Sequence, residues 1–308
     1  MFCGAYTAMV TPFSNGQVDR DQLVANVRFQ VENGIDGLVP SGTTGESPTL
    51  SHEEQRWVNE WVVDAADGKV KVIAGTGSNS TSEALKLTEH ARNIGADGAL
   101  MVNPYYNKPS QEGLYRHFMT IADKVDLPIV LYNIPGRTSI EMTPQTVGRL
   151  STHPNVVGVK EATGSMDTTS LIAQLCDLDQ FAIISGDDSL TLPLMSLGAK
   201  GVISVLSNLI PDRIKAITTA ALASDFESAR SIHYELLDLF KVMFIETNPV
   251  PIKAAMAIAG MDSGELRLPL CELEATNRMK LESVLAAHNI VVARRGGEDE
   301  LAGALNPG

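Results

Sequence analysis

Residues 156–160 read Val-Val-Gly-Val-Lys, a short apolar run that ends in a lysine. The run shows no alternation of apolar and polar residues, which is typical of a parallel strand covered on both faces. Similar runs recur roughly every 20 to 35 residues, with longer helical patterns between them. The other seven runs are 5–10, 37–40, 71–75, 98–102, 128–132, 182–185 and 201–205. Eight such units predict an α/β protein with a (β/α)8 TIM barrel.

The expected helix ends support this spacing. Ser51 and Ser80 each stand three residues before a glutamate, and this pattern predicts a capping box at the start of a helix. Thr143 followed by Pro144 combines a cap with a proline in the first turn. Three helices are expected to end at glycines that lead into strands, namely Gly34, Gly95 and Gly198.

The chain continues for about 100 residues after the eighth predicted strand. Helical patterns cover 216–241, 251–259 and 273–288, and they predict a C-terminal helical extension. The last residues are rich in glycine, alanine and charge, so we expect them to form a flexible tail. The expected division is a catalytic barrel at 1–224, an extension at 225–290 and a tail at 291–308.

The composition excludes several classes of function. The chain has 308 residues and a formal net charge of −13. Binding to nucleic acid or to an anionic membrane requires a clustered basic face, so we expect no nucleic-acid partner and no membrane partner. No apolar run of about 18 residues and no signal-peptide pattern occurs in the sequence.

The cysteines argue against a disulfide framework or a zinc site. Cys3, Cys176 and Cys271 are far apart, odd in number and without metal-ligand spacing. We therefore expect reduced thiols in a cytoplasmic protein, at least one of them packed in the core. The sequence predicts no metal.

Lys160 is the strongest catalytic candidate because barrel enzymes carry their chemistry at the carboxyl ends of the strands. Desolvation at an apolar barrel mouth disfavours the ammonium form, and a neutral amine can attack a carbonyl. The alternative is a lysine whose ammonium extends from the strand end into solvent. Position alone leaves both interpretations open.

Other polar residues follow the predicted strands. Residues 42–45 form a Gly-Thr-Thr-Gly turn whose amides and hydroxyls could bind a carboxylate, although an ordinary turn fits equally well. Tyr132 could be a core aromatic, and paired Tyr105 and Tyr106 could simply pack in their loop. Arg137 could bind a substrate carboxylate or form a surface ion pair.

Several motifs, taken in order along the chain, resemble the dihydrodipicolinate synthase family of pyruvate-dependent Schiff-base lyases. The resemblance runs from about residue 4 to about residue 288. Its motifs are GTTGES (42–47), AGTGSN (74–79), NPYYNKPSQEGLYRHF (103–118), YNIPGRT (132–138), GVKEATG (158–164), SGDDS (185–189), GVISV (201–205) and NPVPIKAA (248–255).

The resemblance implies the activity of a 4-hydroxy-tetrahydrodipicolinate synthase. Lys160 would form an imine with pyruvate, and the resulting enamine would attack aspartate 4-semialdehyde on the diaminopimelate route to lysine. The imine itself is the electron sink, so no cofactor is expected.

The resemblance also assigns roles to individual residues. Thr43, Tyr132 and Tyr106 match a proton relay, and Tyr106 would reach a neighbouring subunit within a homotetramer, a dimer of dimers. The matching substrate-binding residues are Thr44 for pyruvate, Arg137 for the semialdehyde, and Gly186 and Ile203 along the pocket.

A site for feedback lysine is implied at the dimer interface. The matching residues are Ser47, His52, Asn79, Glu83 and Tyr105. The chain departs from sensitive members by Gln55 in place of a histidine and by Pro48 in place of a small residue. The sequence is therefore compatible with an enzyme that lysine inhibits and with one that lysine does not inhibit.

Two other functions compete with the synthase. Another aldolase of the family, such as N-acetylneuraminate lyase, is the nearest, but the Thr43-Thr44 pair and Arg137 favour the synthase. The second is a barrel that binds a metabolite without catalysis. A binding protein would not need the combined set of catalytic residues, namely Lys160, Thr43, Tyr106 and Tyr132.

Overall fold

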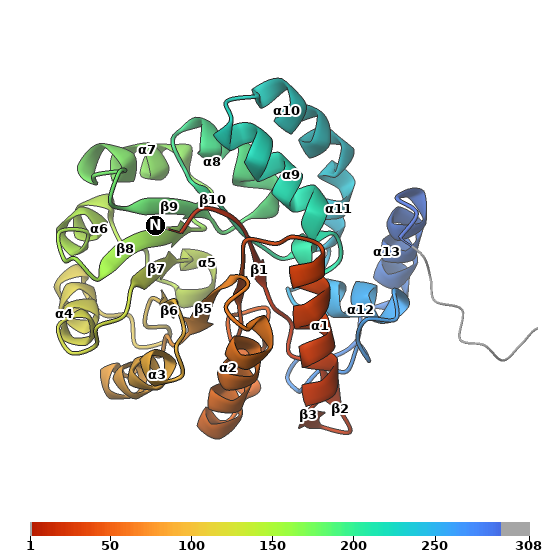
Figure 1. The fold of residues 1–308 in the computed structure, drawn as a ribbon, viewed down its shortest axis with the longest axis horizontal. Coiled ribbons are helices and arrows are strands. Elements are labelled where there is room, and N and C mark those ends of the chain that lie inside the picture. The colour runs from red at the N-terminus through yellow and green to blue at the C-terminus, as the bar shows by residue number, and fades with distance from the viewer. Residues whose placement is uncertain (1, 291–308) are drawn as a thin grey trace, which may run out of the picture.

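A closed barrel of parallel strands forms the centre of the fold, as the sequence predicts (Figure 1). The structure is a computed structural model and describes residues 2–290. The first barrel strand pairs with the last, which closes the barrel. The barrel strands are β1 (Gly4–Ala8), β4 (Gly37–Val39), β5 (Lys71–Gly75), β6 (Gly98–Val102), β7 (Ile129–Asn133), β8 (Val156–Glu161), β9 (Ala182–Ser185) and β10 (Gly201–Ser204).

Helices follow the strands and surround the barrel (Figure 1). The barrel helices are α1 (Arg20–Glu32), α2 (His52–Ala66), α3 (Thr81–Asn93), α4 (Gln111–Ala122), α6 (Pro144–Leu150), α7 (Met166–Leu175), α8 (Thr191–Ser196) and α9 (Pro211–Leu222). Short elements lie in the loops: the hairpin β2 (Phe13–Ser14) and β3 (Gln17–Val18), the helix α5 (Pro135–Thr138), and the 3-10 turns η1 (Ser47–Thr49), η2 (Asp188–Leu190) and η3 (Leu206–Asn208). The sequence did not predict the hairpin.

The predicted helix ends are mostly confirmed. Ser51 forms a full capping box with Glu54, and Thr143 caps α6. The capping box predicted at Ser80 is wrong. The Ser80 hydroxyl pairs with the Ser82 hydroxyl, and the expected partner glutamate instead accepts a hydrogen bond from Ser78. Gly34, Gly95 and Gly198 all have positive φ angles, as expected for helix ends.

The barrel interior is apolar and tightly filled. Tyr6, Val130, Ile184 and Ile203 belong to one buried cluster contributed by strands around the barrel. Such filling leaves no channel, so a polar group can meet substrate only at the end of the barrel. The carboxyl ends of β7 and β8 therefore become the place to look for chemistry.

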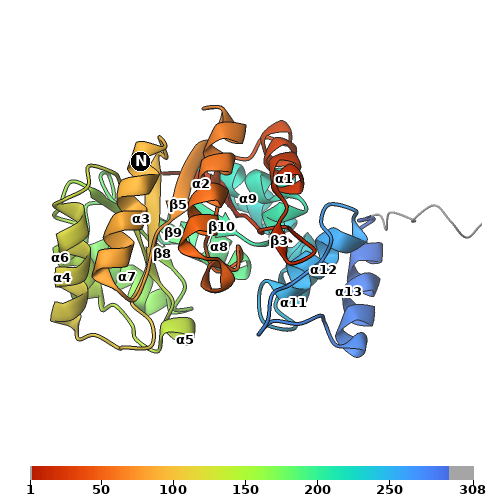
Figure 2. The same ribbon diagram turned by 90° about the horizontal axis from the view of Figure 1, so that it is seen from below.

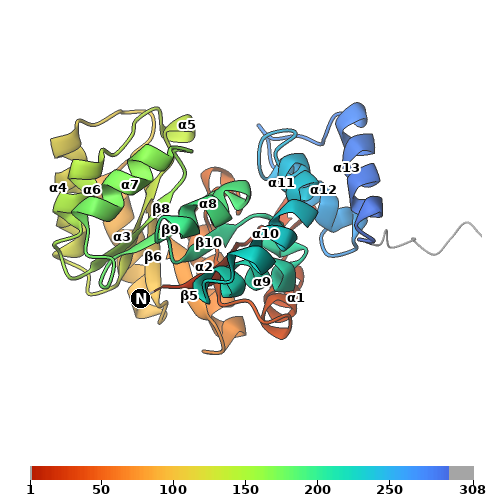
Figure 3. The ribbon, with the colours of Figure 1, turned by 90° about the horizontal axis from the view of Figure 1, so that it is seen from above.

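The C-terminal extension packs on one side of the barrel (Figures 2 and 3). It consists of α10 (Phe226–Glu235), α11 (Leu237–Val242), α12 (Val250–Ile258) and α13 (Ala275–Ala287). The single pattern predicted at 216–241 is divided into α9, α10 and α11, and Ser224 adopts a positive φ of 63° between the first two. The predicted tail at 291–308 lies outside the described residues.

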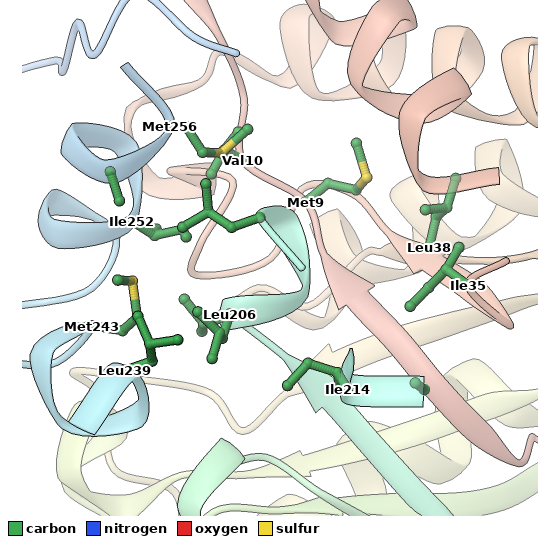
Figure 4. Packing of buried hydrophobic residues seen from close by; sticks show 14 of the residues in the cluster. Met9, Val10, Ile35, Leu38, Leu206, Ile214, Leu239, Met243, Ile252 and Met256 are labelled. Carbon is green, nitrogen blue, oxygen red and sulfur yellow. The ribbon is translucent and has the colours of Figure 1, made fainter. Parts of the chain in front are cut away.

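One hydrophobic core joins the barrel to the extension (Figure 4). Ile252 and Met256 of α12 and Met243 after α11 belong to the same buried cluster as Met9 and Leu206 of the barrel. Burial of each such side chain contributes about 1.5 to 3 kcal/mol. The extension is thus held against the ends of β1 and β10 by apolar packing.

Among residues 2–290, none of the helices is long and apolar enough to cross a membrane. The three cysteines are free thiols, and Cys176 is buried, as the sequence predicts for at least one of them.

Candidate active site

Lys160 lies buried near the carboxyl end of β8. Lys160 is only 6% exposed, and in the sheet it is paired with Tyr132 of β7 and Ile184 of β9. The Lys160 Nζ atom lies 4.3 Å from the centre of the Tyr132 ring. The alternative of a lysine that extends into solvent is therefore wrong. An amine at this place can attack a carbonyl carbon that enters the barrel mouth.

Gly186 leaves the space that the lysine side chain occupies. A Cβ atom at this position would lie 2.8 Å from the Ala162 Cβ and 3.2 Å from the Lys160 Cε. The Gly186 amide donates a hydrogen bond to the Glu161 carbonyl, so its backbone is fixed beside the lysine. A larger side chain would have to displace either β8 or the lysine.

Thr43 and Thr44 lie in a turn after β4. Thr44 is buried, whereas Thr43 is partly exposed. The turn approaches β5 so closely that a Cβ atom on Gly75 would collide with the carbonyl of Ser41. This contact explains why the sequence has a glycine at the end of β5.

The C-terminal extension contributes to the same site. The Asn248 side-chain amide donates a 3.0 Å hydrogen bond to the Thr44 hydroxyl, and the Asn248 carbonyl accepts one of 3.0 Å from Arg137. Asn248 thus connects two residues that the sequence assigns to binding different carboxylates. Sequence reasoning assigned no role to Asn248, although it lies within a motif that carried the resemblance.

A buried polar network stands behind the lysine. Asn103 donates to the Asn133 side chain, which in turn donates to Glu161, so the ends of β6, β7 and β8 are linked. Burial raises the pKa of Glu161, although hydrogen bonds from Thr163 oppose this shift. These bonds fix the strand ends and hence the direction of Lys160.

A second carboxyl group fixes the end of β10. Asp188 accepts hydrogen bonds of 3.0 Å from the amides of Val205 and Leu206. Burial raises the pKa of Asp188 to about 6. The Asp188 contacts hold the backbone just after Ile203, which is 1% exposed and lies in the barrel interior.

A cavity of about 390 Å³ opens beside the barrel mouth. Thr43 and Arg137 line one part of it. Four residues predicted for the lysine site also line it: Ser47, His52, Glu83 and Tyr105. Asn79 does not line the cavity, but its amide donates to the Tyr105 carbonyl. Thr43 and Tyr132 meet at a smaller hollow of about 40 Å³.

Tyr106 points away from the rest of its own chain. It is 90% exposed and adopts a positive φ of 73°. Within one chain it is therefore not assembled with Lys160 and Tyr132, and its assignment to a neighbouring site stays a prediction.

Within residues 2–290, no group of three or more His, Cys, Asp or Glu side chains is arranged to hold a metal ion. The buried polar groups at the barrel mouth include Lys160, Thr44 and Asn133 as well as the separate carboxyl groups of Glu161 and Asp188.

Residues 1–288 match the model of the dihydrodipicolinate synthetase family. The chain belongs to this family. The 4-hydroxy-tetrahydrodipicolinate synthase of Hydrogenobaculum sp. (strain Y04AAS1) is 53% identical over 292 residues, which cover 94% of this chain and all of that protein. The predicted family, the TIM barrel and the class of Schiff-base lyase are confirmed.

Solved structures of the dihydrodipicolinate synthetase family superpose closely on the chain. Dihydrodipicolinate synthase from Aquifex aeolicus has a TM-score of 0.94 and 52% identity, and the match covers 95% of this chain and all of that one. The enzyme from Cyanidioschyzon merolae with lysine bound has a TM-score of 0.91 and 42% identity, with 94% and 99% covered.

Proposed function

We propose that this chain condenses pyruvate with aspartate 4-semialdehyde, the reaction of a 4-hydroxy-tetrahydrodipicolinate synthase. The observation that carries this function is the buried Lys160 amine, placed 4.3 Å from the Tyr132 ring at the mouth of an apolar barrel. Membership of the dihydrodipicolinate synthetase family and relatives that bear the synthase name support it.

Lys160 opens the reaction by attacking the ketone carbon of pyruvate. Water leaves, and the protonated imine draws electrons from the neighbouring methyl group. Loss of a methyl proton gives an enamine, whose carbon attacks the semialdehyde aldehyde. The amine of the adduct then displaces Lys160 and closes the ring, which returns the free lysine.

The residues around Lys160 orient the two substrates. The turn that contains Thr44 offers a hydroxyl and backbone amides to the pyruvate carboxylate. Arg137 is exposed at the cavity and can pair with the carboxylate of the semialdehyde. We assign Gly186 and Ile203 to the substrate pocket as well, because Gly186 lies beside the Lys160 side chain and Ile203 belongs to the barrel interior.

Thr43 and Tyr132 supply the first part of a proton path. They line the same small hollow at the barrel mouth. Tyr106 completes the path from a second subunit, which accounts for its 90% exposure in a single chain. The active form is then an oligomer, and the exposed Leu171 and Leu175 of α7 offer apolar surface for a second contact in a homotetramer.

Trapping of the imine tests the proposed function. Incubation with pyruvate and borohydride should attach a pyruvate-derived group to Lys160, identified by peptide mass spectrometry. The buried Lys253 serves as an internal control and should stay unmodified. An unmodified Lys160 in folded protein would contradict the proposal. Turnover of N-acetylmannosamine with pyruvate, but not of the semialdehyde, would favour the related lyase instead.

The cavity beside the active site also fits free lysine as a regulator. Glu83 can pair with an ammonium group, and Ser47, His52 and Tyr105 surround the same space. A dihydrodipicolinate synthase with lysine bound is among the structures that superpose on this chain. Gln55 lines the cavity too, but its amide donates to the Gly75 carbonyl at 3.0 Å.

Substitution Gln55→His should make lysine inhibition about fivefold more sensitive, the effect of one added hydrogen bond of about 1 kcal/mol. The measurement is the lysine concentration that halves the turnover of pyruvate and semialdehyde. Glu53→His places the same side chain on an exposed position of α2 outside the cavity and should change nothing. Equal sensitivity of the two variants would contradict the role given to position 55.

A further inference from the structure

Lys253 and Glu46 form an ion pair that is completely buried. Both side chains are 0% exposed, and the Lys253 Nζ atom lies 2.7 Å from the Glu46 Oε1 atom. Lys253 belongs to α12 in the C-terminal extension, whereas Glu46 ends the turn that carries Thr43 and Thr44. The pair therefore connects the extension to the substrate-binding turn.

Each partner of the pair makes further contacts. Lys253 donates a 2.9 Å hydrogen bond to the Thr11 carbonyl and lies 4.2 Å from the centre of the Phe13 ring. The other carboxylate oxygen of Glu46 accepts a 3.2 Å bond from the Arg267 amide. Both charges are thus well compensated, and their directions are fixed.

Stability alone gives a poor reason for this pair. Removal of two charges from water costs about as much as their attraction returns, so apolar residues of similar volume are often equally stabilising. The helix around Lys253 is otherwise apolar, with Ile252, Ala255 and Met256 fully buried. The lysine is therefore the exception on a helix that already packs well.

Glu46 determines the shape of the turn. It adopts a left-handed conformation with φ of 52°, and its amide donates a hydrogen bond to the Thr43 carbonyl. The Thr11 hydroxyl donates to the Gly45 carbonyl at 2.7 Å. Lys253 donates to the carbonyl of the same Thr11 and to the Glu46 carboxylate. It therefore contacts both residues that hold the turn in shape.

A second contact from the extension reaches the turn directly. Asn248, five residues before Lys253, donates to the Thr44 hydroxyl. We propose that Lys253 is a positioning residue whose ion pair with Glu46 holds Thr43 and Thr44 where they meet pyruvate. This inference rests on the proposed function of the site and extends it to residues that do not touch substrate.

The test uses the double variant E46Q/K253M in the full chain. Both replacements keep the shape of the side chains but remove the two charges together, so no charge is left unpaired in the pair itself. The readout is the pyruvate concentration that gives half-maximal borohydride labelling of Lys160. A stabilising contact without a positioning role would leave this concentration unchanged.

Arg267→Met is the matched control. The Arg267 side chain also ties the extension to the barrel, by two hydrogen bonds to Glu54 of α2, but it does not contact Thr43 or Thr44. Its backbone bond to Glu46 survives the substitution. Thermal unfolding of both variants shows how much stability each has lost.

The double variant should require at least about tenfold more pyruvate, because a small displacement of a binding group has a large effect on rate and affinity. Arg267→Met should stay within about twofold of the wild type at a comparable loss of stability. An unchanged pyruvate requirement in folded E46Q/K253M would overturn the inference.

Two other outcomes have to be told apart: a double variant that does not fold, and a wild-type protein that is not labelled. If E46Q/K253M does not fold, the single variant E46Q decides, since a raised pyruvate requirement supports the inference and an unchanged one overturns it. Absence of labelling in the wild-type protein would instead contradict the proposed function itself.

Discussion

Substitution Lys160→Ala should lower turnover by at least about 10⁴-fold, because alanine lacks the amine that forms the imine. The side chain is buried above the apolar barrel interior, and alanine removes the amine without introducing a new charge. The circular dichroism spectrum and the oligomeric state should stay those of the wild type. Pyruvate with borohydride should no longer label the protein.

Lys71→Ala is the control for removal of a lysine from a barrel strand. Lys71 begins β5 at the opposite end of the barrel and pairs with Asp97 on the surface. Its loss should leave turnover unchanged, since an exposed pair contributes about 0 to 1 kcal/mol to stability. Turnover of Lys160→Ala within tenfold of the wild type would contradict the assigned role.

Substitution Tyr132→Phe should reduce turnover about 100-fold or more, the range expected for loss of a positioned proton-transfer group. The ring belongs to the apolar cluster of the barrel and lies beside the lysine, so phenylalanine should keep the packing and the fold. Labelling of Lys160 by pyruvate should persist at a slower rate, because the amine is still in place.

Tyr115→Phe is the matched control for the lost phenol. The Tyr115 ring packs against Arg149 on the outer helices, 4.0 Å from the guanidinium carbon. We expect the turnover of the Tyr115→Phe variant, measured with saturating pyruvate and semialdehyde, to equal that of the wild type. Equal turnover in Tyr132→Phe would exclude Tyr132 from the proton path.

The barrel could be predicted from the sequence because each parallel strand is an uninterrupted apolar run. The predicted ends differ from the observed ones by at most two residues, at the end of β1, and by one residue at each end of β7. The capping box at Ser80 failed for a local reason, since Ser78 offers the glutamate a competing hydroxyl. Capping patterns in a stretch with several serines therefore predict the helix but not its bonds.

The candidate site was predictable where it follows strand ends. Lys160, Tyr132 and Gly186 come together because neighbouring parallel strands end at the same edge. Asn248 and Lys253 could not be placed, because their partners are 204 and 207 residues away in the sequence. A charged residue within the apolar run 250–258 was the available signal, since a fully buried lysine requires a partner.

The hydrogen bond from Asn248 to Thr44 and the one from Arg137 to the Asn248 carbonyl also constrain how relatives of this enzyme can be recombined. A chimera that exchanges only the C-terminal helices would bring a foreign asparagine, or none, against the native turn. Crossover points for such libraries should therefore be chosen so that residues 42–46, 137 and 248–253 are inherited from one parent. The catalytic end of the barrel and the C-terminal helices should therefore come from the same parent sequence in any chimera.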